Sequence, residues 1–319
     1  MRRYKKSTRC SKNTADFRSK DTKSVAMEGR FPNRTLPYLL VLPSIVIVAV
    51  FLILPSLQAL YLSLFEVSPF GTRAIFVGLN NFREILTSDD YRFSLRLSVL
   101  FAIAVVVLSM SVSLGMAVLA NKPLRGIGLY RTFLLWPYAL SPAVAGIVWA
   151  LLFEPSSGLM TYLIRLTTDR SPNWMMDANY ALLVIILAAA WKMLGFNIVF
   201  FLAGLQSIPG EMIEAAQVDG ASPRQTFWRV VFPILSPMTF FLFIMNSLYA
   251  FFEVFGLIDV MTQGGPGGGT EVLIYKLYQD GFISIRWGYA SAQSIVLFIL
   301  VSTLTLLQFR YAGRRVFYA

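Results

Sequence analysis

The chain contains no histidine and a single cysteine, Cys10. These absences exclude an internal disulfide, a zinc site built from histidine or several cysteines, and catalysis by a histidine base or a Cys-His pair. Charged residues are also scarce, at 14% of the 319 residues, against about 25% in ordinary soluble proteins. Because 56% of the residues are hydrophobic, most of the surface is too apolar to face water. The composition predicts a membrane protein and leaves few enzyme classes open.

Six apolar stretches are long enough to cross a bilayer, whose core requires about 20 residues per helix. They are 36–64, 97–119, 128–153, 181–205, 237–260 and 289–307. The first contains Pro43 and Pro55, and we expect a kink at each, since membrane helices tolerate proline. It is longer than a signal peptide core and has no clear cleavage site. The sequence predicts an all-α polytopic membrane protein with six transmembrane helices, in which residues 36–319 form the membrane domain around a core at 95–310.

Basic residues indicate how the chain is oriented. The tail 1–35 holds 11 Lys or Arg against 3 acidic residues, and we expect it to be disordered. The termini and the loops on their side of the membrane together hold 19 basic residues, and the alternate loops hold 7. The positive-inside rule therefore predicts a multi-pass protein of the cell (inner) membrane with both termini and the loop 206–236 in the cytoplasm. The tail charge is explained better by contact with anionic membrane lipid than by nucleic acid, which we do not expect as a partner.

Two loops on the outer side of the membrane are predicted to be structured. Residues 76–82 lead into an amphipathic segment, and 157–166 has the pattern of a short surface helix. Their apolar faces fit two interpretations equally well: packing at the membrane interface, or a platform for an external partner.

The cytoplasmic segment 207–237, called the elbow below, carries the signals of two short helices joined by a turn. Gly220 ends the first helix, because glycine readily adopts the left-handed conformation of a helix stop. Ser222 and Gln225 form a capping-box pattern for the second helix. Prolines mark the helix starts and the end of the elbow: Pro209, Pro223, Pro233 and Pro237. Composition alone also allows a surface helix that merely links two spans.

The spacing of residues within the elbow has a family counterpart. Glu214-Ala215-Ala216 is followed after three residues by Gly220, and after nine more by Val230-Val231-Phe232-Pro233. This resembles the EAA loop of binding-protein-dependent ABC importer permeases, which usually have Ile and Leu where Val230 and Phe232 stand. From residue 36 to 319 the chain is similar to the sugar and glycerol-phosphate (maltose-permease-like) branch, closest to permease subunits of glycerol 3-phosphate uptake. The supporting segments are 76–82, 131–142, 262–266, 273–278 and 308–311.

The resemblance implies a type I ABC importer permease fold in which the elbow is a coupling helix seated in a cleft of a cytoplasmic ATPase. It implies Glu214 as an ionic contact and Gly220 as the turn. The implied ATPase-coupling residues are Glu214, Ala215, Ala216, Asp219, Gly220 and Pro233. The implied partners are a homologous second permease, an ATPase dimer that binds ATP and Mg²⁺, and an extracytoplasmic solute-binding protein. This chain itself is expected to bind no cofactor or metal and to have no catalytic residues.

A glycine-rich run at 264–270 does not alter this expectation. It lacks the Gly-Lys-Ser/Thr end of a phosphate-binding P-loop, and the predicted topology puts it on the outer side, where there is no ATP. We expect a flexible loop that contacts the solute-binding protein.

Two ionisable residues lie within predicted spans, where charge is costly and usually functional. These are Lys192 in the fourth span and Glu253 in the fifth. One interpretation is a mid-membrane cavity in which Lys192 attracts an anionic group of the solute and aromatic residues cover its carbon skeleton. The other is a Lys192–Glu253 pair that only joins the two helices. The candidate pathway residues are Ala189, Lys192, Met193, Phe196, Ser247, Ala250, Phe251, Glu253 and Val254.

The resemblance implies sn-glycerol 3-phosphate or a related glycerophosphodiester as solute, with a neutral sugar or oligosaccharide as the alternative. An ion-driven secondary transporter is a second hypothesis, although the internal repeats common in such proteins are not visible here. A membrane acyl- or phosphotransferase is a third, weakened by the lack of histidine and of clustered acidic residues.

Overall fold

The computed structural model describes residues 36–311 except 70–72, 122–126, 169–172 and 175. The predictions about the basic tail concern residues outside this range. The chain divides into two compact units, Met1–Leu57 and Gln58–Ala319, and each is considered by itself.

The described part of the first unit belongs to one apolar helix. It comprises α2 (Leu36–Val48), the π-helical turn η1 (Ala49–Ile53) and the start of α3 (Leu54–Leu62). Residues 38–62 form one candidate membrane span. Pro43 lies within α2, and η1 ends two residues before Pro55, which is the second residue of α3. A π-turn is one way for a helix to absorb a missing backbone donor, so neither proline ends the helix.

The second unit is helical apart from one two-stranded hairpin. Its elements up to the elbow are β1 (Phe65–Val67), β2 (Ala74–Phe76), α4 (Asn80–Thr87), α5 (Asp89–Ala120), α6 (Ile127–Ala139), α7 (Pro142–Leu152), α8 (Leu159–Thr168) and α9 (Ala178–Gln206). From the elbow onward they are α10 (Gly210–Val218), α11 (Pro223–Thr226), η2 (Phe227–Val231), α12 (Phe232–Ile234), α13 (Ser236–Leu248), η3 (Tyr249–Glu253), α14 (Phe255–Met261), α15 (Leu273–Tyr278), η4 (Gln279–Ile283) and α16 (Trp287–Tyr311). The strands pair antiparallel, with Phe65 opposite Phe76.

The membrane spans agree in number with the sequence prediction but differ in shape. In the described residues, four helices are long and apolar enough to cross a membrane, or six if each of two bent pairs counts as one span. The third predicted span, 128–153, is not one helix, because α6 and α7 meet at 107°. Ser141 caps α7 by accepting a hydrogen bond from the Val144 amide at 3.3 Å, and Pro142 occupies its first turn. These residues favour a new helix start over a continuous helix.

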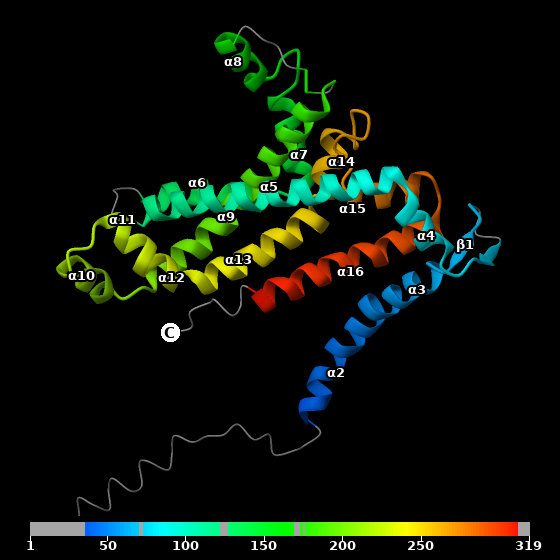
Figure 1. Ribbon diagram of the computed structural model, residues 1–319, viewed down its shortest axis with the longest axis horizontal. Helices are drawn as coiled ribbons and strands as arrows, with labels where there is room; N and C mark the ends of the chain where they lie inside the picture. Colours follow the sequence, from blue (N-terminus) through cyan, green and yellow to red (C-terminus); the bar gives the residue numbers. More distant parts are fainter. Residues whose placement is uncertain (1–35, 70–72, 122–126, 169–172, 175, 312–319) are drawn as a thin grey trace, which may run out of the picture. The chain divides into compact units, whose positions relative to one another are not determined.

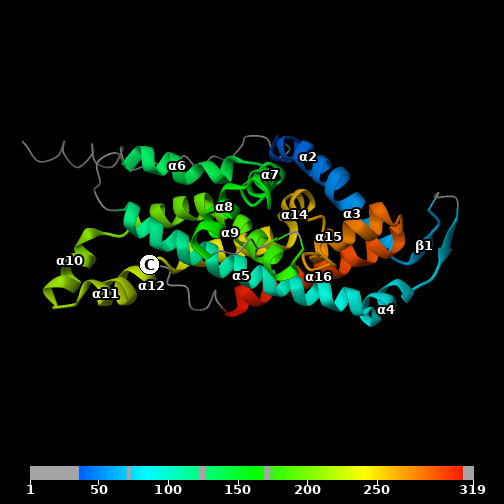
Figure 2. The same cartoon turned by 90° about the horizontal axis from the view of Figure 1, so that it is seen from above.

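The long helices α5 and α9 lie side by side at the centre of the second unit, with α6 and α13 packed against them (Figures 1 and 2). Gly195 permits the approach of α6 to α9: a β-carbon at this position would lie 2.9 Å from the Leu134 carbonyl oxygen. Small residues in α9 such as Ala188 and Ala189, both fully buried, serve the same purpose. Close approach of backbones through small residues is typical of helices that pack within a membrane.

A polar contact lies inside this apolar packing. Asn197 of α9 and Asn246 of α13 exchange two side-chain amide hydrogen bonds of 3.1 and 2.7 Å, and Ser109 of α5 donates to Asn246 Oδ1 at 2.9 Å. All three residues are fully buried. Because an unsatisfied amide is costly in an apolar interior, these bonds fix the relative positions of three membrane helices.

The two ends of the second unit differ. The β1–β2 hairpin and α4 lie at one end, and α10, α11 and α12 lie at the other (Figures 1 and 2). At the hairpin end, Arg286 donates to both carboxylate oxygens of Glu84, at 2.7 and 2.9 Å, which ties α4 to the segment before α16. Helix α4 begins at Asn80, within 76–82, and α8 covers most of 157–166, so both predicted structured loops contain helices.

Candidate functional site: the elbow and the Lys192 region

The elbow has the helix–turn–helix form that its sequence predicts. Gly220 has a φ of +81°, the left-handed conformation that favours glycine. The capping box is complete: the Ser222 amide donates to Gln225 Oε1 at 2.8 Å, and the Gln225 amide donates to Ser222 Oγ at 3.4 Å. Pro223 is in the first turn of α11, and Pro209 is the N-cap residue of α10, so both prolines mark helix starts as predicted.

The predicted coupling residues form an accessible surface. Glu214, Ala215, Asp219 and Gly220 are exposed, and Ala216 and Pro233 are half-buried. Two apolar residues of α10 are also exposed, Val218 at 87% and Met212 at 45%. Within the described residues this surface has no cover, so it is free to contact another protein.

The inner side of the elbow is fixed to the membrane helices. Ile208, Val231 and Leu235 are buried in one cluster with residues of α5, α9 and α13, and Ile213 of α10 packs against that cluster. Leu235 separates two helical segments, Pro223–Ile234 and Ser236–Glu253, that meet at 68°. Side chains of α10, α9 and α13 thus pack in one cluster.

Lys192 is buried near the middle of α9, with 6% of its surface exposed. Its ammonium lies 5.5 Å from the ring centre of Tyr138 and 5.9 Å from that of Tyr249. In the described part of the chain it forms no ion pair within 4 Å, and Glu253 is exposed. A direct Lys192–Glu253 salt bridge, one of the two interpretations of the sequence, is thus not formed in this structure.

The other predicted pathway residues have different environments. Ala189, Met193, Ala250, Phe251 and Val254 are buried in the main apolar core of this chain. Ser247 donates to the Phe243 carbonyl oxygen at 2.8 Å and accepts from Gln308 at 3.0 Å. Phe196 is half-buried in an aromatic group with Tyr138, Phe200 and Phe241. The structure brings Lys192 and Phe196 together beside Tyr138, but it does not place all nine residues around one opening.

Tyr138 and Tyr249 are the residues beside Lys192 that sequence reasoning missed. Tyr249 is 2% exposed, and its hydroxyl has no hydrogen-bond partner among the described residues. It lies four residues before Glu253, a spacing that puts both on one helix face, so the sequence held a signal for it. Tyr138 belongs to α6, and only the tertiary fold brings it to Lys192.

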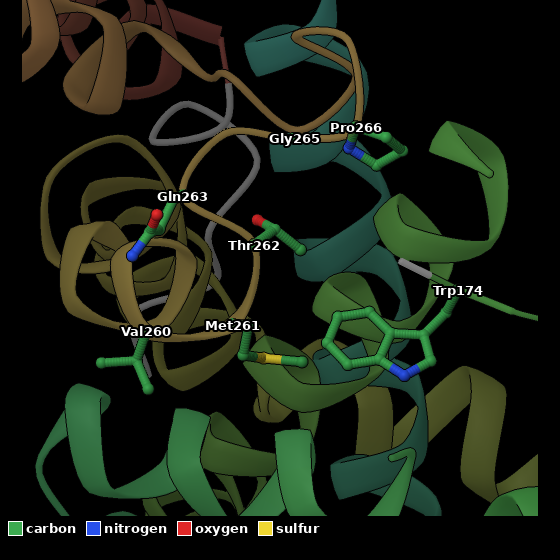
Figure 3. Close-up of a pocket in the computed structure, with 7 residues that line it drawn as sticks. All are labelled: Trp174, Val260, Met261, Thr262, Gln263, Gly265 and Pro266. Carbon is green, nitrogen blue, oxygen red and sulfur yellow. The ribbon is translucent and has the colours of Figure 1, made fainter. Parts of the chain in front are cut away.

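The glycine-rich loop after α14 is folded, which corrects the prediction of a flexible loop. The Thr262 and Thr270 hydroxyls are 2.8 Å apart, and Thr270 Oγ1 donates to the Gly265 carbonyl oxygen at 2.7 Å. The loop borders a cavity of about 340 Å³, in which the Trp174 side chain lies across from Met261 (Figure 3). The lining residues are Trp174, Val260, Met261, Thr262, Gln263, Gly265 and Pro266.

Comparison with known proteins agrees with this arrangement. Residues 111–318 match the family described as binding-protein-dependent transport system inner membrane component. The sn-glycerol-3-phosphate transport system permease protein UgpA of Rhizobium meliloti (strain 1021) is 45% identical over 290 residues, covering 90% of this chain and 98% of the relative. The protein of the same name from Yersinia pestis is 42% identical over 283 residues, covering 89% and 96%.

Solved structures show the same fold. A bacterial ABC transporter involved in import of the acidic polysaccharide alginate superposes with a TM-score of 0.75 at 19% identity, covering 88% of this chain and 95% of its own. The same kind of transporter in complex with an alginate pentasaccharide-bound periplasmic protein gives a TM-score of 0.76, covering 88% and 94%.

The exposed elbow, the bent spans and these matches define the class. The chain belongs to the family of binding-protein-dependent transport system inner membrane components and is a permease subunit of an ABC importer with the type I fold.

Proposed function

We propose that this permease subunit carries sn-glycerol 3-phosphate or a related glycerophosphodiester across the membrane. The observation that carries the proposal is Lys192, a buried ammonium without an acidic partner within 4 Å in the described residues. A cation in this position is stabilised when an anionic group binds beside it. The relatives' name agrees with a phosphorylated solute.

The residues around Lys192 also match the hydroxyl groups and the short carbon chain of such a solute. The unpartnered hydroxyl of Tyr249 supplies a hydrogen bond to a phosphate or hydroxyl oxygen, and the rings of Tyr138 and Phe196 offer apolar surface for a short carbon chain. A few polar groups on an apolar wall are typical of small-molecule sites.

The energy for transport comes, in this proposal, from a separate ATPase dimer that holds ATP and Mg²⁺ and receives α10 in a cleft. Support comes from the free apolar and acidic surface of α10, which includes Val218 and Glu214. A homologous second permease completes the pathway, and an extracytoplasmic binding protein delivers the solute. By the positive-inside rule, the elbow and both termini are placed on the cytoplasmic side in this proposal.

Replacement of Lys192 tests the solute proposal. Lys192→Met keeps an unbranched side chain, one atom shorter, but removes its charge, and charged hydrogen bonds contribute about 1.5–3 kcal/mol. Uptake of radiolabelled glycerol 3-phosphate at low concentration should therefore fall by about 10- to 100-fold. Lys192→Arg, which retains the charge, should keep a larger part of the uptake.

The control is ATP hydrolysis by the assembled importer, stimulated by its solute-loaded binding protein. Lys192→Met should leave assembly and this stimulation in place, which separates a defect in solute contact from a defect in folding. Wild-type uptake by Lys192→Met, or an equal loss for a neutral sugar and for the phosphate, would contradict the role of Lys192.

A further inference from the structure

The second helical segment of the elbow has an outer surface that the packing of this chain does not use. Trp228 of η2 is 54% exposed. Its ring is held on both sides, with centroids 5.1 Å from those of Phe227 and of Phe232. Thr226 and Val231, on the inner side, are buried. The exposed tryptophan is thus a fixed feature of the outer side of the helix.

The direction of this segment follows from the bend that succeeds it. Residues Pro223–Ile234 meet Ser236–Glu253 at 68°. Membrane helices are tilted by about 20° on average from the bilayer normal, so the elbow segment lies about 48° to 88° from that normal. It runs closer to the plane of the membrane than across it, at the point where the chain enters the bilayer.

The same segment carries unpaired positive charge. Arg224 and Arg229 are exposed, and neither forms a salt bridge within 4 Å in the described part of the chain. Residues 220–252 contain no Asp or Glu. Arg224 and Trp228 are four residues apart, a spacing that brings side chains to one helix face.

We propose that Trp228, Arg224 and Arg229 form a lipid-binding surface, with the Trp228 ring at headgroup level and the two guanidinium groups on the phosphates of anionic lipids. Tryptophan is enriched at membrane interfaces, and basic residues beside a span attract anionic lipid. Contact with lipid restricts lateral movement of the elbow along the membrane. A movement of α10 then rotates α13. This inference does not depend on which solute is carried.

Fluorescence quenching in nanodiscs tests the position of Trp228. Trp228→Cys and Val218→Cys, each in a Cys10→Ser background, are labelled with bimane in the fully assembled importer. Val218 is the control because it lies on the surface of α10 that, in the proposed function, faces the ATPase and not the lipid. Lipids with a nitroxide near the headgroup should quench the label at 228 about threefold more than the label at 218. Equal quenching would overturn the proposal, and so would quenching at 228 that occurs only when the ATPase is removed.

Charge removal provides a second test, which does not require a change at Trp228. We compare Arg224→Gln/Arg229→Gln with Arg83→Gln/Arg165→Gln, a control pair of exposed arginines outside the elbow. Raising the anionic lipid content of nanodiscs should increase transport-coupled ATP hydrolysis in the wild type and in the control pair, and the elbow pair should lose at least about half of that increase. An unchanged lipid response in the elbow pair would overturn the proposal.

Discussion

At the scale of single residues, amide and hydroxyl groups determine how the apolar helices are aligned. Asn197, Asn246 and Ser109 are fully buried, yet each has a hydrogen-bond partner. Hydrogen bonds between membrane helices contribute about 0.6 kcal/mol on average. A buried polar group that loses its partner costs more, about 1–3 kcal/mol.

We predict that Asn246→Ala lowers the stability of the permease by about 1–3 kcal/mol, because Asn197 is left without its partner. The double variant Asn197→Leu/Asn246→Leu removes both amides and should be more stable than Asn246→Ala. Thermal unfolding in detergent measures both. Thr239→Ala, which removes a hydroxyl that donates to the carbonyl oxygen of the N-cap residue Leu235 at 3.1 Å, is the control. A double variant less stable than the single one would contradict this explanation.

At the scale of elements, the elbow depends on the left-handed turn at Gly220. A β-carbon there would meet no atom within 4 Å, so substitution acts through backbone conformation and not through a clash. Gly210, at the start of α10, is equally open but does not have a positive φ. These two glycines form a matched pair for testing whether the orientation of α10 matters for coupling.

We predict that Gly220→Ala lowers the free energy of unfolding by about 1–2 kcal/mol, because alanine is strained in the left-handed turn. Gly210→Ala should change the free energy of unfolding by no more than about 0.5 kcal/mol. Gly220→Pro, which fixes φ near −65°, should abolish uptake while the protein remains in the membrane. A bulky residue at Ala216 should have the same effect. ATP-dependent uptake of labelled solute measures each variant, and normal uptake by Gly220→Pro would show that the turn is not needed.

The elbow and the break between α6 and α7 show which parts of the fold could be predicted from the sequence. The elbow was predictable because its signals are local: Gly220, the Ser222–Gln225 box and Pro223 act within a few residues. The break between α6 and α7 has local signals too, Ser141 and Pro142, but they lie inside a long apolar run that hides them. A hydropathy pattern reports only the length and composition of an apolar run, so it does not show that the run is bent.

The Lys192 region was predictable only in part. A lysine within an apolar span is visible in the sequence, and its pathway role stays a prediction. Its partners were not visible, because Tyr138 comes from a helix 54 positions earlier and packing alone brings it near. The same holds for Asn197 and Asn246, whose contact depends on the register of α9 against α13.

At the scale of the whole molecule, the family and fold are those of an ABC importer permease subunit, and such a subunit is one part of a larger assembly. The free surface of α10 and the exposed apolar residues Val218 and Met212 fit a cytoplasmic partner. The packed cluster around Leu235 connects that surface to α13. We therefore expect the energy for transport to enter through the elbow from a nucleotide-driven partner.

Reconstitution in proteoliposomes tests this requirement most directly. The permease is assembled with its second permease and ATPase subunits, and uptake of labelled glycerol 3-phosphate is measured with and without ATP and the solute-binding protein. We expect uptake only when all components and ATP are present. Uptake by this chain alone, driven by an ion gradient without nucleotide, would contradict it.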